Sequence, residues 1–244
     1  MNVYLNSITG IGDAIVSMFM SHRTWTRELE IHIYAVCQQV LNYNGSLKEY
    51  DESLASEFAE FHKWFTSLLK WGWCHTTMLR FIDLSVSVEG LHRAGQDDWD
   101  AHAKRFDNRI IRNSTRSKHS DFLYEVSSYY EDKIIATDLA AKELNIQLPE
   151  TFTHNGKTYV KRVNGYILDE YKDDPDVKRG LYMLSIPSNF IFKINLTEWG
   201  HIYKLRNEKS GANPEVRLCC EMIADQLGEF HKEFDRTLFE KIQN

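Results

Sequence analysis

Proline, glycine and long apolar runs are scarce in this sequence. Its 244 residues include only four prolines and twelve glycines, and no linker, low-complexity stretch or internal repeat interrupts them. No apolar run approaches the roughly 20 residues of a membrane-spanning helix. The first residues, MNVYLNSITG, lack the cationic start and apolar stretch of a secretory leader. With 43% apolar residues, the sequence predicts a single domain over residues 1–244, located in the cytoplasm, with no membrane partner.

Cysteine is also scarce, and its spacing carries no metal signature. Cys37, Cys74, Cys219 and Cys220 form no C-x-x-C pair. Adjacent cysteines such as Cys219 and Cys220 seldom form a disulfide with each other, because the required geometry is strained. We therefore expect ordinary reduced thiols and no bound metal.

Positive charge is in deficit overall but concentrated locally. The net charge is -6, which argues against a protein that coats nucleic acid without sequence preference, since such binding needs a broad basic face. Residues 104–118 nevertheless contain only one acid, Asp107, among their basic residues, which are Lys104, Arg105, Arg109, Arg112, Arg116 and Lys118. Two interpretations stay open: a solvated helix face paired with neighbouring acids, or a site for a small phosphate.

Hydrophobic spacing predicts several helices. In residues 52–71, apolar side chains recur every three or four positions, which describes one buried stripe on a helix. The last helix has strong start signals, with Asn213 as its cap and Pro214 at its first position. The predicted helices cover about 12–22, 27–43, 52–71 and 120–144, and run from Pro214 to Phe234.

Other segments have the period of a strand. In residues 81–88, polar and apolar side chains alternate, as expected of a strand with one buried face. The pair Asn155-Gly156 tolerates the positive φ angles of a type I′ turn and predicts a hairpin over 151–162. A further strand is expected within 180–196. The fold class is therefore α+β, with a central, mostly antiparallel sheet flanked by long helices.

Individual side chains point weakly to phosphate binding. Arg217 falls in the first turns of the last helix, where the macrodipole disfavours a cation by some tenths of a kcal/mol unless an anion binds nearby. The alternative is a solvated or ion-paired arginine. Taken singly, His75, His102 and His201 are more typical of ordinary hydrogen-bonded histidines. No glycine-rich phosphate loop or nucleophile elbow is present. The residues alone predict an α+β domain with a basic, phosphate-binding cleft.

Four blocks, in order, are similar to the flavin-dependent thymidylate synthase family and span about residues 75–217. HTTMLRFIDLSVSVEG resembles that family's His-x-Ser/Thr-x-x-Glu-His segment, which precedes a strand ending in Glu-Gly. STR resembles its Ser-x-Arg, and KRGLYMLSIP its Ala-Arg-x-x-Leu-Pro segment. NLTEWGHIYKLRNEKSGANPEVR resembles the family's closing Asn-Leu-Arg and Glu-Ile-Arg blocks.

The resemblance implies a homotetramer with FAD at its subunit interfaces, in a bacterial or phage-infected cell. It also implies that the protein makes dTMP from dUMP or acts on a related pyrimidine nucleotide. Methylenetetrahydrofolate would donate the carbon and NADPH would be the reductant. Reduced flavin would supply the hydride, and no cysteine nucleophile would be needed.

The resemblance also assigns site residues by position. Ser114 and Arg116 would hold the phosphate of dUMP, and Arg179 would add a second cation. Arg217 would be the catalytic residue, because it would face the pyrimidine oxygen and stabilise the anionic base. The positions that match FAD contacts are His75, Thr77, His102, Asn195 and His201.

The sequence departs from the family at its Arg-His-Arg signature. One count places Ala101-His102-Ala103 there, and moving the extra residues upstream places Lys104-Arg105-Phe106 there instead. Arg80 stands where the family usually has glutamate. These changes touch the flavin and folate side of the site, so two alternatives stay open. They are a flavin- and folate-dependent pyrimidine nucleotide hydroxymethylase and a catalytically silent nucleotide-binding homologue. The role of residues 151–166 is also open.

Overall fold

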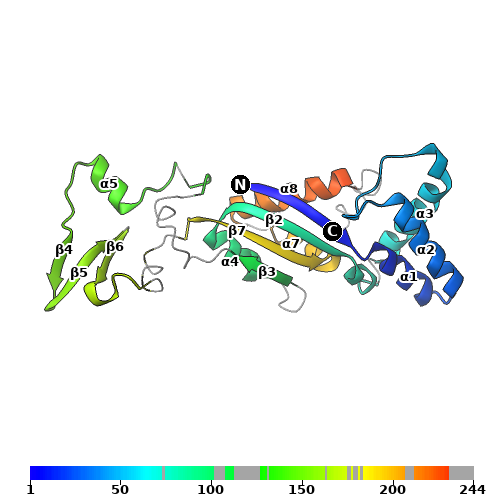
Figure 1. Cartoon of the computed structure of the whole chain (residues 1–244), viewed down its shortest axis with the longest axis horizontal. Coiled ribbons are helices and arrows are strands. Elements are labelled where there is room, and N and C mark those ends of the chain that lie inside the picture. Colours follow the sequence, from blue (N-terminus) through cyan, green and yellow to red (C-terminus); the bar gives the residue numbers. More distant parts are fainter. Residues whose placement is uncertain are drawn as a thin grey trace. The chain divides into compact units, whose positions relative to one another are not determined.

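The computed structural model confirms the α+β class (Figure 1). It describes residues 1–72, 75–101, 108–112, 127–130, 132–162, 164–174, 177, 181, 184–206 and 212–230. The chain divides into two compact units. The first unit comprises Met1, Glu89–Asp97 and Arg112–Phe190, and the second comprises Asn2–Val88, Asp98–Ile111 and Ile191–Asn244. The predicted single domain stays a prediction.

The main sheet has four strands in the order β1-β2-β7-β3. Leu84, Val86 and Val88 are buried in β2, and the polar residues between them are not, which confirms the predicted alternation. The side chain of Gln226 on α8 bonds to the backbone of β1, donating to the Val3 oxygen and accepting from the Leu5 nitrogen, both at 2.6 Å. The strands are β1 (Asn2–Thr9), β2 (Asp83–His92), β3 (Asn108–Arg112) and β7 (Pro187–Asn195).

After β1, the second unit continues with helices in the regions predicted for them at about 12–22, 27–43 and 52–71. The predicted ends differ most at α2, because Leu41 is already extended and forms a bridge with Leu47. Phe81, predicted to lie in a strand, belongs instead to the short helix η2. The elements are α1 (Ile11–Ser21), α2 (Arg27–Val40), η1 (Glu52–Leu54), α3 (Ala55–Gly72) and η2 (Met78–Phe81).

Three more helices lie in or next to the segments that form the main sheet. They are α4 (Arg93–Ala101), α7 (Leu196–Arg206) and α8 (Pro214–Phe230). The predicted cap of α8 is confirmed, since the Asn213 Oδ1 accepts the Glu215 N–H at 2.9 Å. Phe234 lies outside the described residues. In the core of the second unit, the Trp99 ring contacts those of Phe192 and Trp199.

The first unit contains a three-stranded antiparallel sheet with the order β4-β5-β6. The predicted hairpin is confirmed, because Asn155 and Gly156 have φ angles of 50° and 73° and connect β4 directly to β5. The elements are α5 (Thr137–Glu143), β4 (Thr151–His154), β5 (Lys157–Arg162), β6 (Gly165–Leu168) and η4 (Asp169–Tyr171). No described helix is long and apolar enough to cross a membrane.

The helix predicted over 120–144 is wrong in part. Residues 128–130 form a turn, and the chain becomes helical only at Thr137. Tertiary contacts outweigh the spacing here. The Ser127 N–H donates to the Ser185 oxygen at 2.9 Å, and the Tyr130 ring lies edge-on to His92 at 4.9 Å. Residues 120–126 lie outside the described part of the chain.

Candidate nucleotide and flavin site

Five of the predicted site residues lie in described segments of the second unit. They are His75, Thr77, Asn195, His201 and Arg217. The other four lie outside the described residues, so their positions stay predictions: His102, Ser114, Arg116 and Arg179.

A short loop after α3 presents His75 and Thr77 to solvent. The His75 N–H donates to the Trp71 oxygen at 2.9 Å, and the His75 oxygen accepts the Met78 N–H at 3.0 Å. Met78 and the residue after it are buried, whereas His75 and Thr77 are exposed. The apolar side chains of η2 therefore anchor the loop, and its polar side chains remain accessible to a ligand.

The same loop is joined to the start of α7, which lies more than a hundred residues later in the chain. The Thr197 Oγ1 donates to the Thr76 oxygen at 3.0 Å. The Leu196 N–H donates to the Ile82 oxygen at 2.8 Å. These bonds bring two of the similar sequence blocks together, so that the His75 loop lies beside the amino terminus of α7.

Asn195 and His201 have different positions on this structure. Asn195 is 5% exposed, and its Oδ1 accepts the Glu198 N–H at 2.9 Å, so it caps α7. His201 is exposed and lies one turn beyond Thr197. The amino terminus of α7 carries partial positive charge, and exposed polar side chains lie beside it. The first turn of α7 also contains the buried acid Glu198, so the exposed side chains of the His75 loop and of His201 are the groups here that a polar ligand could contact.

Arg217 is the predicted catalytic residue and lies near the start of α8. Its N–H donates to the Asn213 oxygen at 2.9 Å, which places it in the first turns of α8, and its side chain is half-buried. Within the described part of the chain, no acid forms an ion pair with its guanidinium. A half-buried cation at the positive end of a helix favours an anionic ligand.

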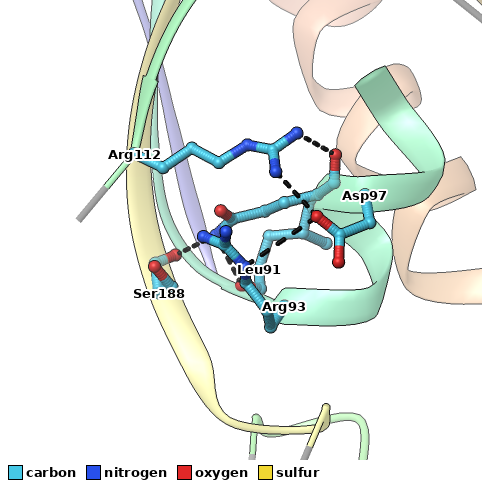
Figure 2. Close-up of polar contacts among 6 residues, drawn as sticks. Leu91, Arg93, Asp97, Arg112 and Ser188 are labelled. Atoms are coloured by element: carbon cyan, nitrogen blue, oxygen red, sulfur yellow. Dashed lines mark hydrogen bonds and ion pairs between the residues drawn. The ribbon is translucent and has the colours of Figure 1, made fainter. Parts of the chain in front are cut away.

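Arg109 and Arg112 are the described basic residues of the segment 104–118, and both are paired with acids. The Arg109 guanidinium lies 2.8 Å from the Asp83 carboxylate. The Arg112 guanidinium lies 2.7 Å from the Asp97 carboxylate. Figure 2 shows this ion pair. For these two arginines the structure favours the pairing interpretation, although β3 is a strand and not the helix that this interpretation assumed. Both partners precede residues 104–118 in the chain, so no local pattern in the sequence pairs them with these arginines.

Gln96 is a third residue that no motif in the sequence singles out. It is fully buried, and its Nε2 donates to the Leu91 oxygen at 3.1 Å and to the Ser188 oxygen at 3.0 Å. The Arg112 guanidinium also donates to the Gln96 backbone oxygen, at 3.0 Å. These bonds hold the start of α4 against β2 and β7. They therefore position the chain that leads into the altered signature at His102.

The described cysteines are free and buried. Burial, with a smaller contribution from Asp13, raises the pKa of the Cys37 thiol to about 12. Burial also raises the pKa of Cys219 and Cys220 well above the ordinary value. These thiols are protonated at neutral pH and cannot serve as thiolate nucleophiles. No described group of His, Cys, Asp and Glu side chains is arranged to hold a metal ion.

Comparison with known proteins identifies the family. A family model described as Thymidylate synthase complementing protein matches residues 24–231. The chain belongs to this family, that of the flavin-dependent thymidylate synthases. No curated protein matches it.

Two solved structures from Helicobacter pylori share the fold. One is the flavin-dependent thymidylate synthase ThyX complexed with FAD and dUMP, with 13% identity and a TM-score of 0.53, covering 96% of this chain and 98% of that chain. The other is thymidylate synthase X with FAD and dUMP, with 13% identity and a TM-score of 0.54, covering 98% and 100%. At this identity the likeness shows the fold alone.

Proposed function

We propose that the protein methylates dUMP to dTMP, with FAD as cofactor, methylenetetrahydrofolate as carbon donor and NADPH as reductant. The observation that carries this proposal is the pair of bonds from Thr197 to Thr76 and from Leu196 to Ile82. They assemble the predicted FAD contacts from segments far apart in the sequence. Family membership supports the same assignment.

The flavin site would be built around the start of α7. His75, Thr77 and His201 would contact FAD through exposed polar atoms, and Asn195 through the amide nitrogen that it does not use to cap α7. His102 would complete the set. When bound, FAD would supply the hydride. The contribution of these side chains would be to orient the cofactor beside the start of α7.

The nucleotide would be held by cations. Ser114, Arg116 and Arg179 would bind the phosphate of dUMP, and Arg217 would face the pyrimidine oxygen. Negative charge on that oxygen would be stabilised by a guanidinium that forms no ion pair with a described acid. The unpaired, half-buried state of Arg217 among the described residues supports this role.

The absorbance spectrum of the purified protein tests the flavin assignment, and the mass of the nucleotide product tests the reaction. We expect a flavin band, and dTMP formed from dUMP only when methylenetetrahydrofolate and NADPH are both present. A colourless protein that binds dUMP without turnover would instead be the catalytically silent homologue.

One observation favours a second candidate, the pyrimidine nucleotide hydroxymethylase. Arg80 is exposed on η2, beside the predicted flavin contacts, where the family usually has glutamate. Such a change of charge alters the field on the flavin side, where the one-carbon unit would be reduced. A product carrying a hydroxymethyl group in place of the methyl group would establish this alternative.

We predict that Arg116→Ala weakens dUMP binding by about 1.5–3 kcal/mol, the range of a hydrogen bond to an ionised group. FAD retention should change much less. Equilibrium titration with dUMP measures the effect, and Lys118→Ala is the matched control, since it removes a neighbouring charge with no assigned contact. Equal losses of dUMP and FAD affinity would mean that Arg116 supports the fold instead.

We also predict a homotetramer whose FAD sites are shared between subunits. Ile111 is 74% exposed on β3, and Ile191 is 43% exposed on the adjacent strand β7, as expected for a face that another subunit covers. Sedimentation of the FAD-loaded protein measures the assembly. A stable monomer that retains one FAD per chain would contradict the shared site.

A further inference from the structure

An exposed tryptophan lies directly beside the predicted flavin contact His75. Trp71 is in the last turn of α3, and 41% of its surface is exposed. The His22 ring lies edge-on to it, with ring centres 4.5 Å apart and planes at 82°. The His75 ring is nearly parallel to the indole, at 21°, with centres 6.4 Å apart. We call these three side chains the aromatic platform.

Trp71 is more exposed than the apolar residues that precede it on the same face of α3. Phe61, Phe65 and Leu68 of α3 are each at most 2% exposed, because they face the core. Trp71 follows Leu68 by three positions, so it continues the same apolar stripe, but its ring emerges into solvent. Trp71 therefore presents part of its indole to solvent directly beside His75.

The aromatic platform is held by backbone structure at the ends of two helices. The His22 N–H donates to the Met18 oxygen at 3.2 Å, which ties His22 to the end of α1. The His75 N–H donates to the backbone oxygen of Trp71 itself. Backbone hydrogen bonds therefore hold the residues that carry these rings. Less conformational entropy is lost when a ligand stacks on rings that are already held in place.

We propose that the aromatic platform binds the fused heteroaromatic ring of a cofactor by stacking on Trp71. This inference rests on the proposed function for its choice of ligand. The flavin of FAD and the pterin of methylenetetrahydrofolate share that chemistry, since both are flat, conjugated and rich in nitrogen. Stacking on an indole recognises the flat face of a ring and tolerates differences at its edge.

The test compares Trp71→Ala and Trp71→Phe with wild type. FAD is titrated into the flavin-free protein, and methylenetetrahydrofolate is titrated into the FAD-loaded protein. The alanine variant should bind the stacked ligand about tenfold more weakly or worse, and the phenylalanine variant should recover most of that loss. The arm that shows the loss identifies whether the flavin or the pterin is stacked.

Trp25→Ala is the matched control. Trp25 is also an exposed tryptophan, at 38%, but its Nε1 donates to the Glu30 carboxylate at 3.0 Å, and among the described residues its ring forms no ring contact with Trp71 or His75. Its loss should leave both affinities at the wild-type value. Circular dichroism of every variant should show the same helix content as wild type.

The outcomes separate this inference from the proposed function. If wild type makes dTMP and Trp71→Ala binds both ligands as wild type does, the inference is wrong and the function stands. If wild type makes no dTMP but binds either ligand with an affinity that depends on Trp71, the function is wrong and the inference stands. If wild type binds neither ligand, both are wrong.

Discussion

Replacing Arg217 with lysine is expected to lower turnover at least about tenfold, equivalent to about 1.4 kcal/mol of transition-state stabilisation. Lysine keeps the charge but loses the planar fork that can contact a carbonyl oxygen and its neighbour together. Arg217→Ala should cost about a hundredfold to a thousandfold, as for the removal of one donor to a developing oxyanion. FAD content and folding should stay near wild type.

The measurement is single-turnover oxidation of pre-reduced enzyme by dUMP and methylenetetrahydrofolate, followed at the flavin band. Arg27→Lys is the matched control, because Arg27 also lies in the first turn of a helix but is paired with Glu30 at 2.6 Å. It should react at the wild-type rate. An Arg217→Lys protein that reoxidises as fast as wild type and yields the same product would remove Arg217 from the mechanism.

Trp99→Ala is expected to lower the free energy of unfolding by about 3–5 kcal/mol, the range for removing a buried large aromatic side chain. Trp99 is fully buried, and its ring centre lies 4.9 Å from that of Phe192 and 6.3 Å from that of Trp199. Alanine leaves a cavity between α4, β7 and α7 that these rings cannot fill without moving.

Urea unfolding at a fixed protein concentration measures this loss, because any assembly makes stability depend on concentration. Trp25→Ala, at an exposed position, should change the free energy of unfolding by no more than about 0.5 kcal/mol. A loss below about 1 kcal/mol for Trp99→Ala would show that these rings do not form a close-packed core.

Local signals predicted much of the fold. Asn213 and Pro214 mark the start of α8 because a cap acts on backbone groups within three residues of itself. Asn155-Gly156 specifies its hairpin through the φ angles of two adjacent residues. The helix expected through Tyr130 failed because its spacing competes with the Ser127 to Ser185 bond and the His92 contact, which involve distant segments.

The candidate site was predicted less completely, for the same reason. Sequence similarity named Asn195 as a cofactor contact, but not that it is buried and caps α7. Similarity also could not show that Arg109 is paired with Asp83, or that Arg217 is paired with no described acid. A motif records which side chains are present, whereas a charge is neutralised by whichever group the fold brings within a few ångströms.

The sequence by itself therefore determined the helical and strand periods, the cap and hairpin turns, and the order of the four similar blocks. Each of these depends on residues that are neighbours along the chain. The tertiary structure alone decided that Thr76 meets Thr197, that Asp83 and Asp97 pair with the two arginines of β3, and that Trp71 is exposed beside His75. Periodicity specifies which face of an element is buried, but the partner of that face is set by the packing of segments distant in sequence.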